Sequence, residues 1–169
     1  SSFLEFRRLA PFLSKQHQLL IPDLFGFGFC PRHKNINYNT EALIFHLNTI
    51  LNQFTKGKNV GLIGASMGGA VAMELARLHP TKINRLLLLS PAGLTGRPMQ
   101  VPRPLDQIGV WFLKQKFVRR NLCRQAFANR NFSVGEAEEQ IASFHLQVPG
   151  WGRSLAAFAR TGGLANCGM

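Results

Sequence analysis

Two apolar runs separated by a helical segment constrain the fold of this chain more than any other feature. Residues 59–63 (NVGLI) and 85–90 (RLLLLS) are each of strand length and nearly continuous in apolar residues. Between them, the spacing from Met67 to His79 predicts a helix that stops before Pro80. Because apolar strands joined by a helix form parallel sheets that are covered on both faces, we expect an α/β fold.

The segments before the first of these strands continue the same alternation. The spacing of apolar residues predicts a helix over residues 2–14 and a short strand over residues 18–22, ending at Asp23. The next segment, LFGFGFCPRHKNINYN, is rich in Gly, Pro and Asn, and we expect an ordered loop. A strongly amphipathic helix then begins at Thr40, with its apolar face formed by Leu43, Ile44, Leu47, Ile50, Leu51 and Phe54.

The character of the chain changes after Ser90. The stretch PAGLTGRPMQVPRP has four prolines and two glycines, and no convincing strand follows it. We expect helices over residues 105–117 and 119–128, a third helix to His145 that begins at a capping box of Ser133 and Glu136, and a short one at RSLAAFAR.

Chain length and cysteine spacing narrow the class of protein. No apolar run reaches the length of about 18 residues that a transmembrane helix needs, and the N-terminal residues do not resemble a signal peptide. The three cysteines, Cys30, Cys123 and Cys167, lie far apart without a C-x-x-C pair. This pattern favours neither a disulfide framework nor a zinc site, so we expect a reducing, cytoplasmic compartment and no metal or cofactor.

The charge of the chain leaves two kinds of partner to consider. The net charge is +12 and the isoelectric point is near 10.9, with many basic residues between Arg97 and Arg130. Such a charge is compatible with nucleic acid or an anionic membrane surface. The chain has no zinc-finger spacing, RNP-like aromatic motif or basic recognition helix, so we expect no nucleic-acid partner.

The motif G-x-S-x-G occurs once, as GASMG around Ser66. The motif is weak alone, but here the apolar strand stops at the serine and a helix begins directly after it. That order is typical of a nucleophile elbow, a sharp turn that lifts the serine hydroxyl above the sheet. We therefore predict that Ser66 is a nucleophile. The alternative is a glycine-rich turn with an incidental serine.

The residues next to Ser66 suit the same chemistry. Gly64 and Gly68 would remove side chains where strand and helix crowd together, and Gly69 would allow closer packing still. The backbone N–H of Met67 lies at the predicted helix N-terminus, where unpaired donors favour negative charge. We expect this N–H to stabilise an oxyanion formed at Ser66.

The stretch LIGASMGGAVAMELARLHPTKINRLLLLSPAGL resembles the central part of the α/β-hydrolase superfamily. LLIPDLFGFG upstream is similar to the family's strand and Asp-x-x-Gly-x-Gly loop, and SMGGA and SPAGL resemble the branch with carbon–carbon bond hydrolases and monoacylglycerol-type lipases. The resemblance implies an incomplete α/β-hydrolase core over residues 1–94, a helical cap over 95–160 and a tail over 161–169.

The resemblance implies a serine hydrolase in which an acid and then a histidine follow the nucleophile along the chain. Asp23 matches a structural loop residue of the family, and Asp106 lies within the cap segment. His145 is the only histidine late in the chain, but it falls on an expected cap helix. We therefore expect the catalytic acid and histidine to lie outside this chain.

The resemblance also implies that a strand is missing. In the family, a strand lies between those corresponding to residues 18–22 and 59–63, and the His-Gly loop that follows it supplies the second oxyanion donor. We expect both to precede residue 1. Without that strand, buried backbone groups would lack partners, so the sequence suggests a fragment of a longer hydrolase.

The substrate is expected to be a small ester or lipid-like molecule. Phe25, Phe27 and Met67 flank the expected pocket, and the alternative is ordinary core packing. The basic, aromatic cap segment WFLKQKFVRRNLCRQAF could contact a membrane, or be a solvated helix face. Two other readings stay open: an inactive, hydrolase-like binding module, and a basic membrane-associated protein.

Overall fold

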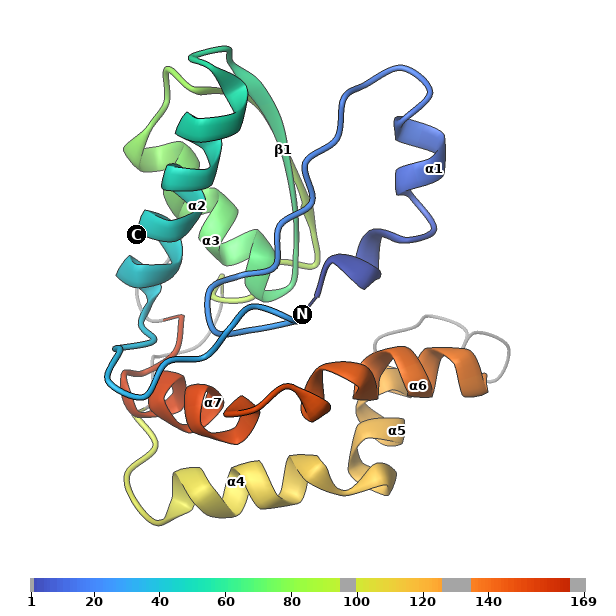
Figure 1. Ribbon diagram of the computed structural model, residues 1–169, viewed down its shortest axis with the longest axis vertical. Coiled ribbons are helices and arrows are strands. Elements are labelled where there is room, and N and C mark those ends of the chain that lie inside the picture. The colour runs from blue at the N-terminus through green and yellow to red at the C-terminus, as the bar shows by residue number, and fades with distance from the viewer. Residues whose placement is uncertain (1, 95–99, 126–134, 165–169) are drawn as a thin grey trace.

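The computed structural model describes residues 2–94, 100–125 and 135–164. The two strands and the helices α2 and α3 form one part of the molecule, and the helices α4 to α7 form a second part beneath it (Figure 1). The α/β fold class is confirmed. The elements are η1 (Phe3–Phe6), α1 (Ala10–Leu13), α2 (Thr40–Thr55), β1 (Val60–Ala65), α3 (Met67–Leu78), β2 (Ile83–Leu89), α4 (Leu105–Lys114), α5 (Lys116–Gln125), α6 (Glu136–Phe144), η2 (His145–Gln147) and α7 (Trp151–Arg160).

The N-terminal segment is not one helix, as the sequence predicted for residues 2–14. It consists of the short 3-10 helix η1 and the single-turn helix α1. Pro11 lies in the first turn of α1. Because proline has no N–H and its ring clashes with the carbonyl of the preceding turn, it begins a new helix rather than continuing one.

The two strands form a parallel sheet in which Ala65 lies opposite Leu89. Val60 and Ser66 donate their backbone N–H groups to β2-side carbonyls, at 2.9 and 3.0 Å. N–H groups alternate in direction along a strand. The amides of Gly61, Ile63 and Ala65 therefore point away from β2, and we call them the outward amides.

The strand predicted over residues 18–22 is not formed. This segment runs alongside β1 in Figure 1 but carries no strand pairing, and the sheet of the described residues has only the order β1-β2. An extended segment needs a hydrogen-bonding neighbour to become part of a sheet. A cavity separates residues 18–24 from β1, so neither has such a neighbour on that side.

The second strand was predicted to be buried, and this prediction is wrong. Leu86, Leu87 and Leu89 are 40%, 53% and 41% exposed. Parallel strands are normally covered on both faces. In the part of the chain that the structure describes, β2 pairs only with β1, so its second edge and much of its apolar surface are open.

The core lies between α2 and α3 and continues into the loop before α2. Asn39 caps α2, because its side-chain oxygen accepts from Ala42 N at 2.9 Å, and Lys56 ends the helix in a left-handed conformation. The buried apolar residues on this helix are those that the sequence pattern predicted to face inward, apart from Ile50 and Phe54. The core cluster consists of Leu24, Phe27, Tyr38, Leu43, Ile44, Leu47, Leu51, Val71, Leu75 and Phe158.

The first cap helix ends earlier than predicted. Instead of one helix over residues 105–117, the structure has α4 and α5, separated by Gln115 in an extended conformation with ψ of 128°. The Arg119 guanidinium donates to the carbonyl of Leu113 at 3.3 Å and to that of Lys114. Basic side chains that bind the last carbonyls of a helix stabilise its end, which accounts for the break.

Parts of the other predicted cap helices lie outside the described residues. Ser133 lies there, as does the end of the helix predicted to reach Ala128. Helix α6 begins at Glu136, and the side chain of Glu138 accepts from Gly135 N at 3.1 Å. This bond supplies half of a capping box, centred two residues later than predicted.

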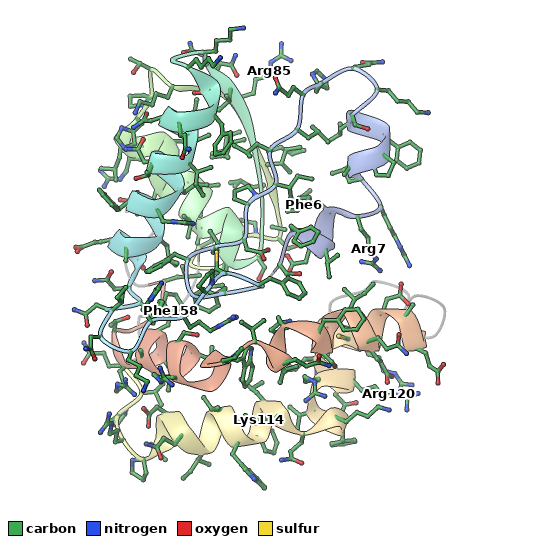
Figure 2. All side chains as sticks on the ribbon, viewed as in Figure 1. Phe6, Arg7, Arg85, Lys114, Arg120 and Phe158 are labelled. Carbon is green, nitrogen blue, oxygen red and sulfur yellow. The ribbon has the colours of Figure 1, made fainter. Side chains whose placement is uncertain are left out.

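Helix α7 connects the cap to the core. Ser154 Oγ donates to the carbonyl of Gly26 at 2.8 Å, and Phe158 packs edge-on against Phe27 with ring centroids 5.2 Å apart. A second connection is the ion pair of Arg7 with Glu138, at 2.9 Å. Figure 2 shows Phe158 and Arg7 on the sides of the cap and the N-terminal segment that face each other. The boundary at residue 94 stays a prediction, since residues 95–99 are not described.

Candidate active site

Ser66 occupies a strained turn between β1 and α3. The strand ends at Ala65, the helix begins at Met67, and Ser66 itself has φ of 49° and ψ of −120°. These angles are those of the first central residue of a type II′ turn, which glycine normally occupies. A non-glycine residue there costs about 1–3 kcal/mol, and such strain concentrates at functional sites. The exposed side chain of Ser66 lies at this turn.

Backbone hydrogen bonds hold Ser66 in its strained conformation. Its N–H donates to the carbonyl of Leu89 at 3.0 Å, which ties the turn to the end of β2. Its carbonyl accepts from Gly69 N and Ala92 N, both at 2.9 Å. The turn is therefore fixed on three sides, by the neighbouring strand, by the first turn of α3 and by the loop after β2.

The glycines around Ser66 are not equivalent. A Cβ on Gly64 would lie 2.7 Å from the Cα of Gly69, and one on Gly69 would lie 2.7 Å from the Cβ of Pro91. These two positions are too crowded for a side chain. The expected crowding at Gly68 is wrong, because a Cβ there would meet nothing within 4 Å. Gly68 instead lines one end of the cavity beside β1.

The position of Met67 suits the oxyanion role that the sequence predicted. It is the first residue of α3, and the N–H groups of a first helical turn have no partner within the helix. In residues 2–94, 100–125 and 135–164, no acceptor is found for Met67 N. This donor lies next to the exposed Ser66 side chain and at the positive end of the helix dipole. Its role in binding an oxyanion stays a prediction.

Ser66 has no histidine partner among the described residues. All five histidines lie within the described ranges, and none of them hydrogen-bonds to the serine. Burial in the cap, with Arg32 and Arg119 nearby, lowers the pKa of His145 to about 4. Burial also lowers the pKa of His46, a residue of α2 whose ring centroid lies 5.3 Å from that of Phe25. Both rings are thus neutral, packed groups rather than partners of the nucleophile.

The two aspartates of the chain have other partners. Asp23 accepts from Phe29 N at 2.7 Å and from Phe3 N at 2.5 Å, as expected for a residue that shapes its loop. Asp106 is 3% exposed and forms an ion pair with Arg160 of α7. Both carboxylates therefore stabilise local structure, and neither orients a histidine toward Ser66.

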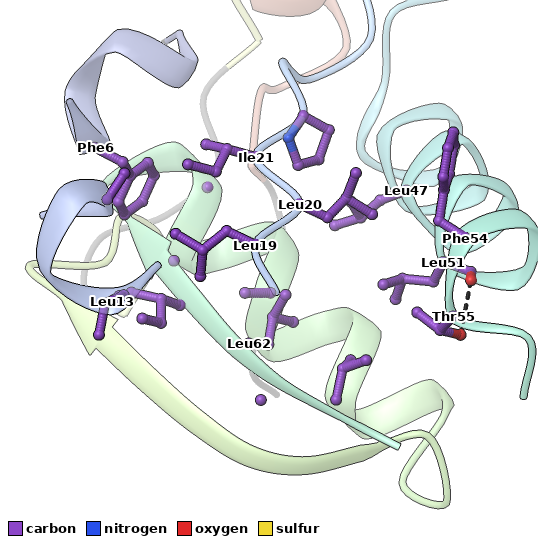
Figure 3. A pocket seen from close by; sticks show the side chains of 18 of the residues that line it. Phe6, Leu13, Leu19, Leu20, Ile21, Leu47, Leu51, Phe54, Thr55 and Leu62 are labelled. Carbon is purple, nitrogen blue, oxygen red and sulfur yellow. Dashed lines mark hydrogen bonds between the residues drawn. The ribbon is translucent and has the colours of Figure 1, made fainter. Parts of the chain in front are cut away.

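A groove of about 690 Å³ separates β1 from the extended segment at residues 18–24, and we call it the sheet groove. Its walls are the outward side of β1 and the apolar side chains of that segment. Ser66 does not line the sheet groove, although its neighbour Ala65 and Gly68 do. Figure 3 shows the apolar lining, which includes Leu19, Leu20, Ile21, Leu62, Leu47, Leu51 and Phe54.

The phenylalanines expected to flank a substrate pocket pack into the core instead. Phe27 is 9% exposed and contacts Phe158, and Phe25 lies 5.2 Å from Tyr38. Met67 packs at the edge of the same core cluster. None of the three lines the sheet groove.

Metal-binding clusters and membrane-spanning helices are both absent from the described residues. Within the described segments, no three His, Cys, Asp or Glu side chains gather closely enough to hold a metal ion. No helix in those segments is both long and apolar enough to cross a membrane. Cys30 and Cys123 are free thiols, and burial raises the pKa of each. Cys167 lies outside the described residues.

Comparison with known proteins places these features in a wider group. A family model described as "alpha/beta hydrolase fold" matches residues 1–147. A 2-hydroxymuconate semialdehyde hydrolase of Pseudomonas sp. (strain CF600) is 28% identical over 160 residues, which are 93% of this chain and 53% of that protein. Lipase 1 of Psychrobacter immobilis is 35% identical over 88 residues, which are 52% of this chain and 27% of that protein.

Solved structures show the same fold at lower identity. A meta-cleavage product hydrolase from Pseudomonas fluorescens IP01 superposes with a TM-score of 0.76 at 24% identity, covering 98% of this chain and 61% of that one. Cfl2 from Burkholderia cenocepacia gives a TM-score of 0.77 at 22% identity, covering 95% and 60%. This chain therefore spans about half the length of its curated relatives and three fifths of these structures.

Proposed function

The chain belongs to the alpha/beta hydrolase family, and we propose on that premise that it carries the nucleophile, Ser66, of a longer serine hydrolase. The observation that carries the proposal is the conformation of Ser66, with φ of 49° between β1 and α3. A serine has no local reason to occupy this region, and backbone hydrogen bonds to β2, to the first turn of α3 and to the loop after β2 hold it there. A nucleophile elbow requires such a turn, because the turn exposes the hydroxyl.

The proposed reaction is acyl transfer through a covalent intermediate. Ser66 Oγ attacks the substrate carbonyl while a histidine takes its proton, and the Met67 N–H stabilises the resulting oxyanion. The histidine then gives the proton to the leaving group, and an acyl-serine remains. Water, deprotonated by the same histidine, releases the acyl group as an acid. The histidine and its acidic partner belong to parts of the protein outside this chain.

We propose further that an additional strand of the longer protein occupies the sheet groove. Two observations on the groove itself support it. The outward amides of β1 have no strand partner among the described residues, and the groove has an apolar lining. The chain also spans 53% of the length of the Pseudomonas hydrolase. A strand in the groove would pair with β1 and with residues 18–24 and so continue the sheet.

The proposed substrate is a small apolar molecule with an ester or a related carbon–carbon bond next to a carbonyl. The relatives' names support these two classes, since they include hydrolases of meta-cleavage products and lipases. Both bond types can be cleaved by the same serine chemistry, because each presents a carbonyl to the nucleophile. An assay is therefore needed to decide which bond is cleaved. It compares the hydrolysis rates of short nitrophenyl esters, long nitrophenyl esters and a meta-cleavage product.

A pre-steady-state assay tests the nucleophile. The longer protein, expressed with its flanking coding sequence, is mixed with p-nitrophenyl acetate, and nitrophenolate release is followed in a stopped-flow instrument. We expect a burst of about one equivalent per protein, because acylation precedes slower deacylation. Ser66→Ala removes the burst, while Ser90→Ala, at a second positive-φ serine of the described residues, keeps it.

Two outcomes of this assay would contradict the proposal. A burst that survives in Ser66→Ala would place the nucleophile elsewhere. No burst and no turnover of any of the three substrate types, in a longer protein that is folded, would favour an inactive binding module with a hydrolase fold.

A further inference from the structure

Helix α4 exposes a row of large apolar side chains to solvent. Leu105, Ile108, Trp111 and Phe112 are 55%, 54%, 62% and 54% exposed. Ile108 lies three residues after Leu105, and Trp111 and Phe112 lie three and four residues after Ile108, so the four side chains lie on one side of the helix. A contiguous apolar surface of this kind is uncommon on a monomeric protein and marks a contact site.

This apolar face points away from the rest of the molecule. The opposite side of α4 packs on α7, where Asp106 is 3% exposed and paired with Arg160, and Val110 lies against Gly152. In Figure 1, α7 lies between α4 and the part of the molecule that holds the sheet. A strand added in the sheet groove therefore would not cover the apolar face of α4.

Basic side chains are frequent on α4 and α5, the two helices that carry the exposed apolar residues. Between residues 105 and 125 the sequence has five Lys and Arg residues and a single acidic residue, the buried Asp106. The apolar surface continues into α5 through Phe117, which is 72% exposed. Arg120 is paired with Glu139 at 2.7 Å, whereas Lys114, Lys116 and Arg124 are exposed along the same two helices (Figure 2 labels Lys114 and Arg120).

We propose that α4 and the start of α5 dock on an anionic lipid bilayer. Trp, Phe, Ile and Leu side chains on one helix face insert at the boundary between headgroups and acyl chains, and Lys and Arg beside them bind lipid phosphates. The positive charge of α4 and α5 favours an anionic membrane as the partner over a second copy of the chain. A second copy of the chain on the same face would bring two equally basic surfaces together. The proposal rests on the cap alone and does not require Ser66 to be a nucleophile.

The consequence for the proposed enzyme is access to an apolar substrate. A cap bound to the bilayer surface would lie where lipid-like and aromatic molecules concentrate. The part of the molecule that holds the sheet would then lie on the side of α7 that faces the water. Recruitment depends on two additive contributions, apolar insertion and electrostatic attraction. Each can be removed separately by substitution on the exposed side of α4 and α5.

The chain offers a built-in probe for the test. It has two tryptophans, Trp111 on the apolar face and Trp151 in α7. In the 169-residue chain with Trp151→Phe, Trp111 is the sole tryptophan. On vesicles with 30% phosphatidylglycerol in phosphatidylcholine, we expect its emission to shift to the blue and to be quenched by brominated acyl chains. Neither change is expected with pure phosphatidylcholine vesicles.

Variants separate the two contributions. Ile108→Glu with Phe112→Glu should reduce vesicle binding at least tenfold in cosedimentation. Lys116→Glu should reduce vesicle binding about fivefold or more, and added salt should further weaken the binding of this variant. Phe45→Glu is the matched control, because Phe45 is 74% exposed on α2, in the part of the molecule that holds the sheet, and its replacement should leave binding unchanged.

Three results would overturn the proposal. Equal binding to neutral and anionic vesicles would remove the role of charge, and binding unaffected by the double Glu variant would place the contact elsewhere. No vesicle binding, with a concentration-dependent dimer in sedimentation that the double variant abolishes, would assign the face to a second copy. Loss of the nitrophenolate burst in Ser66→Ala is independent of all three, so failure of either proposal is recognised separately.

Discussion

Replacing Gly64 by alanine tests whether the close approach of β1 and α3 holds the elbow. The new Cβ would lie 2.7 Å from the carbonyl oxygen of Gly68, 2.7 Å from the Cα of Gly69 and 2.8 Å from the Cβ of Ala72. Two of these neighbours are backbone atoms, so they cannot move without shifting the helix. Overpacking of this kind destabilises the folded chain by about 1–3 kcal/mol. Alanine also lowers the conformational entropy of the unfolded chain, which stabilises the fold by about 0.4–1 kcal/mol.

The net expectation for Gly64→Ala is a loss of about 1–2 kcal/mol. With a urea dependence of about 2 kcal/mol per molar for a chain of this size, the unfolding midpoint should fall by about 0.5–1 M. The assay is urea unfolding of the 169-residue chain, followed by circular dichroism at 222 nm. Lower stability should accompany loss of the burst when the same substitution is made in the longer protein.

Gly68→Ala is the matched control for this prediction. Gly68 is the second residue of α3, close to Gly64 of β1, but its Cβ would meet nothing within 4 Å. Alanine is favoured over glycine in a helix by about 0.8–1 kcal/mol, so the midpoint should stay the same or rise. If Gly64→Ala is as stable as the parent chain, or if Gly68→Ala is the more damaging change, the packing argument is refuted.

Three further predictions concern strain, protonation and the open sheet edge. Ser66→Gly should be about 1 kcal/mol more stable than Ser66→Ala in urea, because alanine keeps the strained Cβ and glycine does not; equal stabilities would contradict the strain. The pKa of His145 is lowered to about 4 in the folded protein. Its contribution to the free energy of unfolding is therefore complete above pH 6.5 and is lost as the pH falls toward 4. After a discount for partial exposure, this contribution is on the order of 1–2 kcal/mol, and His145→Gln should remove it from a urea series between pH 7 and 4.5; an unchanged slope would exclude the buried neutral ring. In hydrogen exchange of the 169-residue chain, the outward amides of β1 should exchange at least tenfold faster than the amides between them, and equal protection would mean that the sheet groove is filled.

The elbow and its flanking elements could be predicted because their sequence signals are local. An apolar run, a serine between glycines and a helical periodicity together specify strand, turn and helix around Ser66. The sharp turn was predicted, whereas the positive φ of Ser66 was seen only in the structure. The crowding at Gly64 and Gly69 also followed, whereas the open space at Gly68 depends on what fills the groove beside it.

Burial of the strands could not be predicted, because it depends on distant neighbours. The run RLLLLS has the composition of a covered strand, yet β2 has one strand beside it and exposes three leucines among the described residues. Residues 18–22 have strand-like composition but no partner to pair with. Composition reports what a segment can bury, and the sheet around it decides what it does bury.

The cap helices differ from the prediction where their ends or faces depend on side chains of a neighbouring helix. Apolar spacing gave helices at about the right places, but the end of α4 depends on Arg119, which reaches back to its last carbonyls. The exposure of one face of α4 was not predicted either, because Trp and Phe residues such as Trp111 and Phe112 are usually found in protein cores. Which face of a helix is covered is settled by packing on α7, which periodicity alone does not specify.

Mapping a fluorophosphonate adduct by mass spectrometry tests the central claim most directly. The longer protein is labelled, digested and analysed beside its Ser66→Ala variant. The account predicts one phosphonate per molecule, located on Ser66 in the peptide that joins β1 to α3 and absent from the variant. An adduct on another residue, or no adduct on a folded protein that contains the complete sheet, would contradict the assignment of Ser66 as the nucleophile.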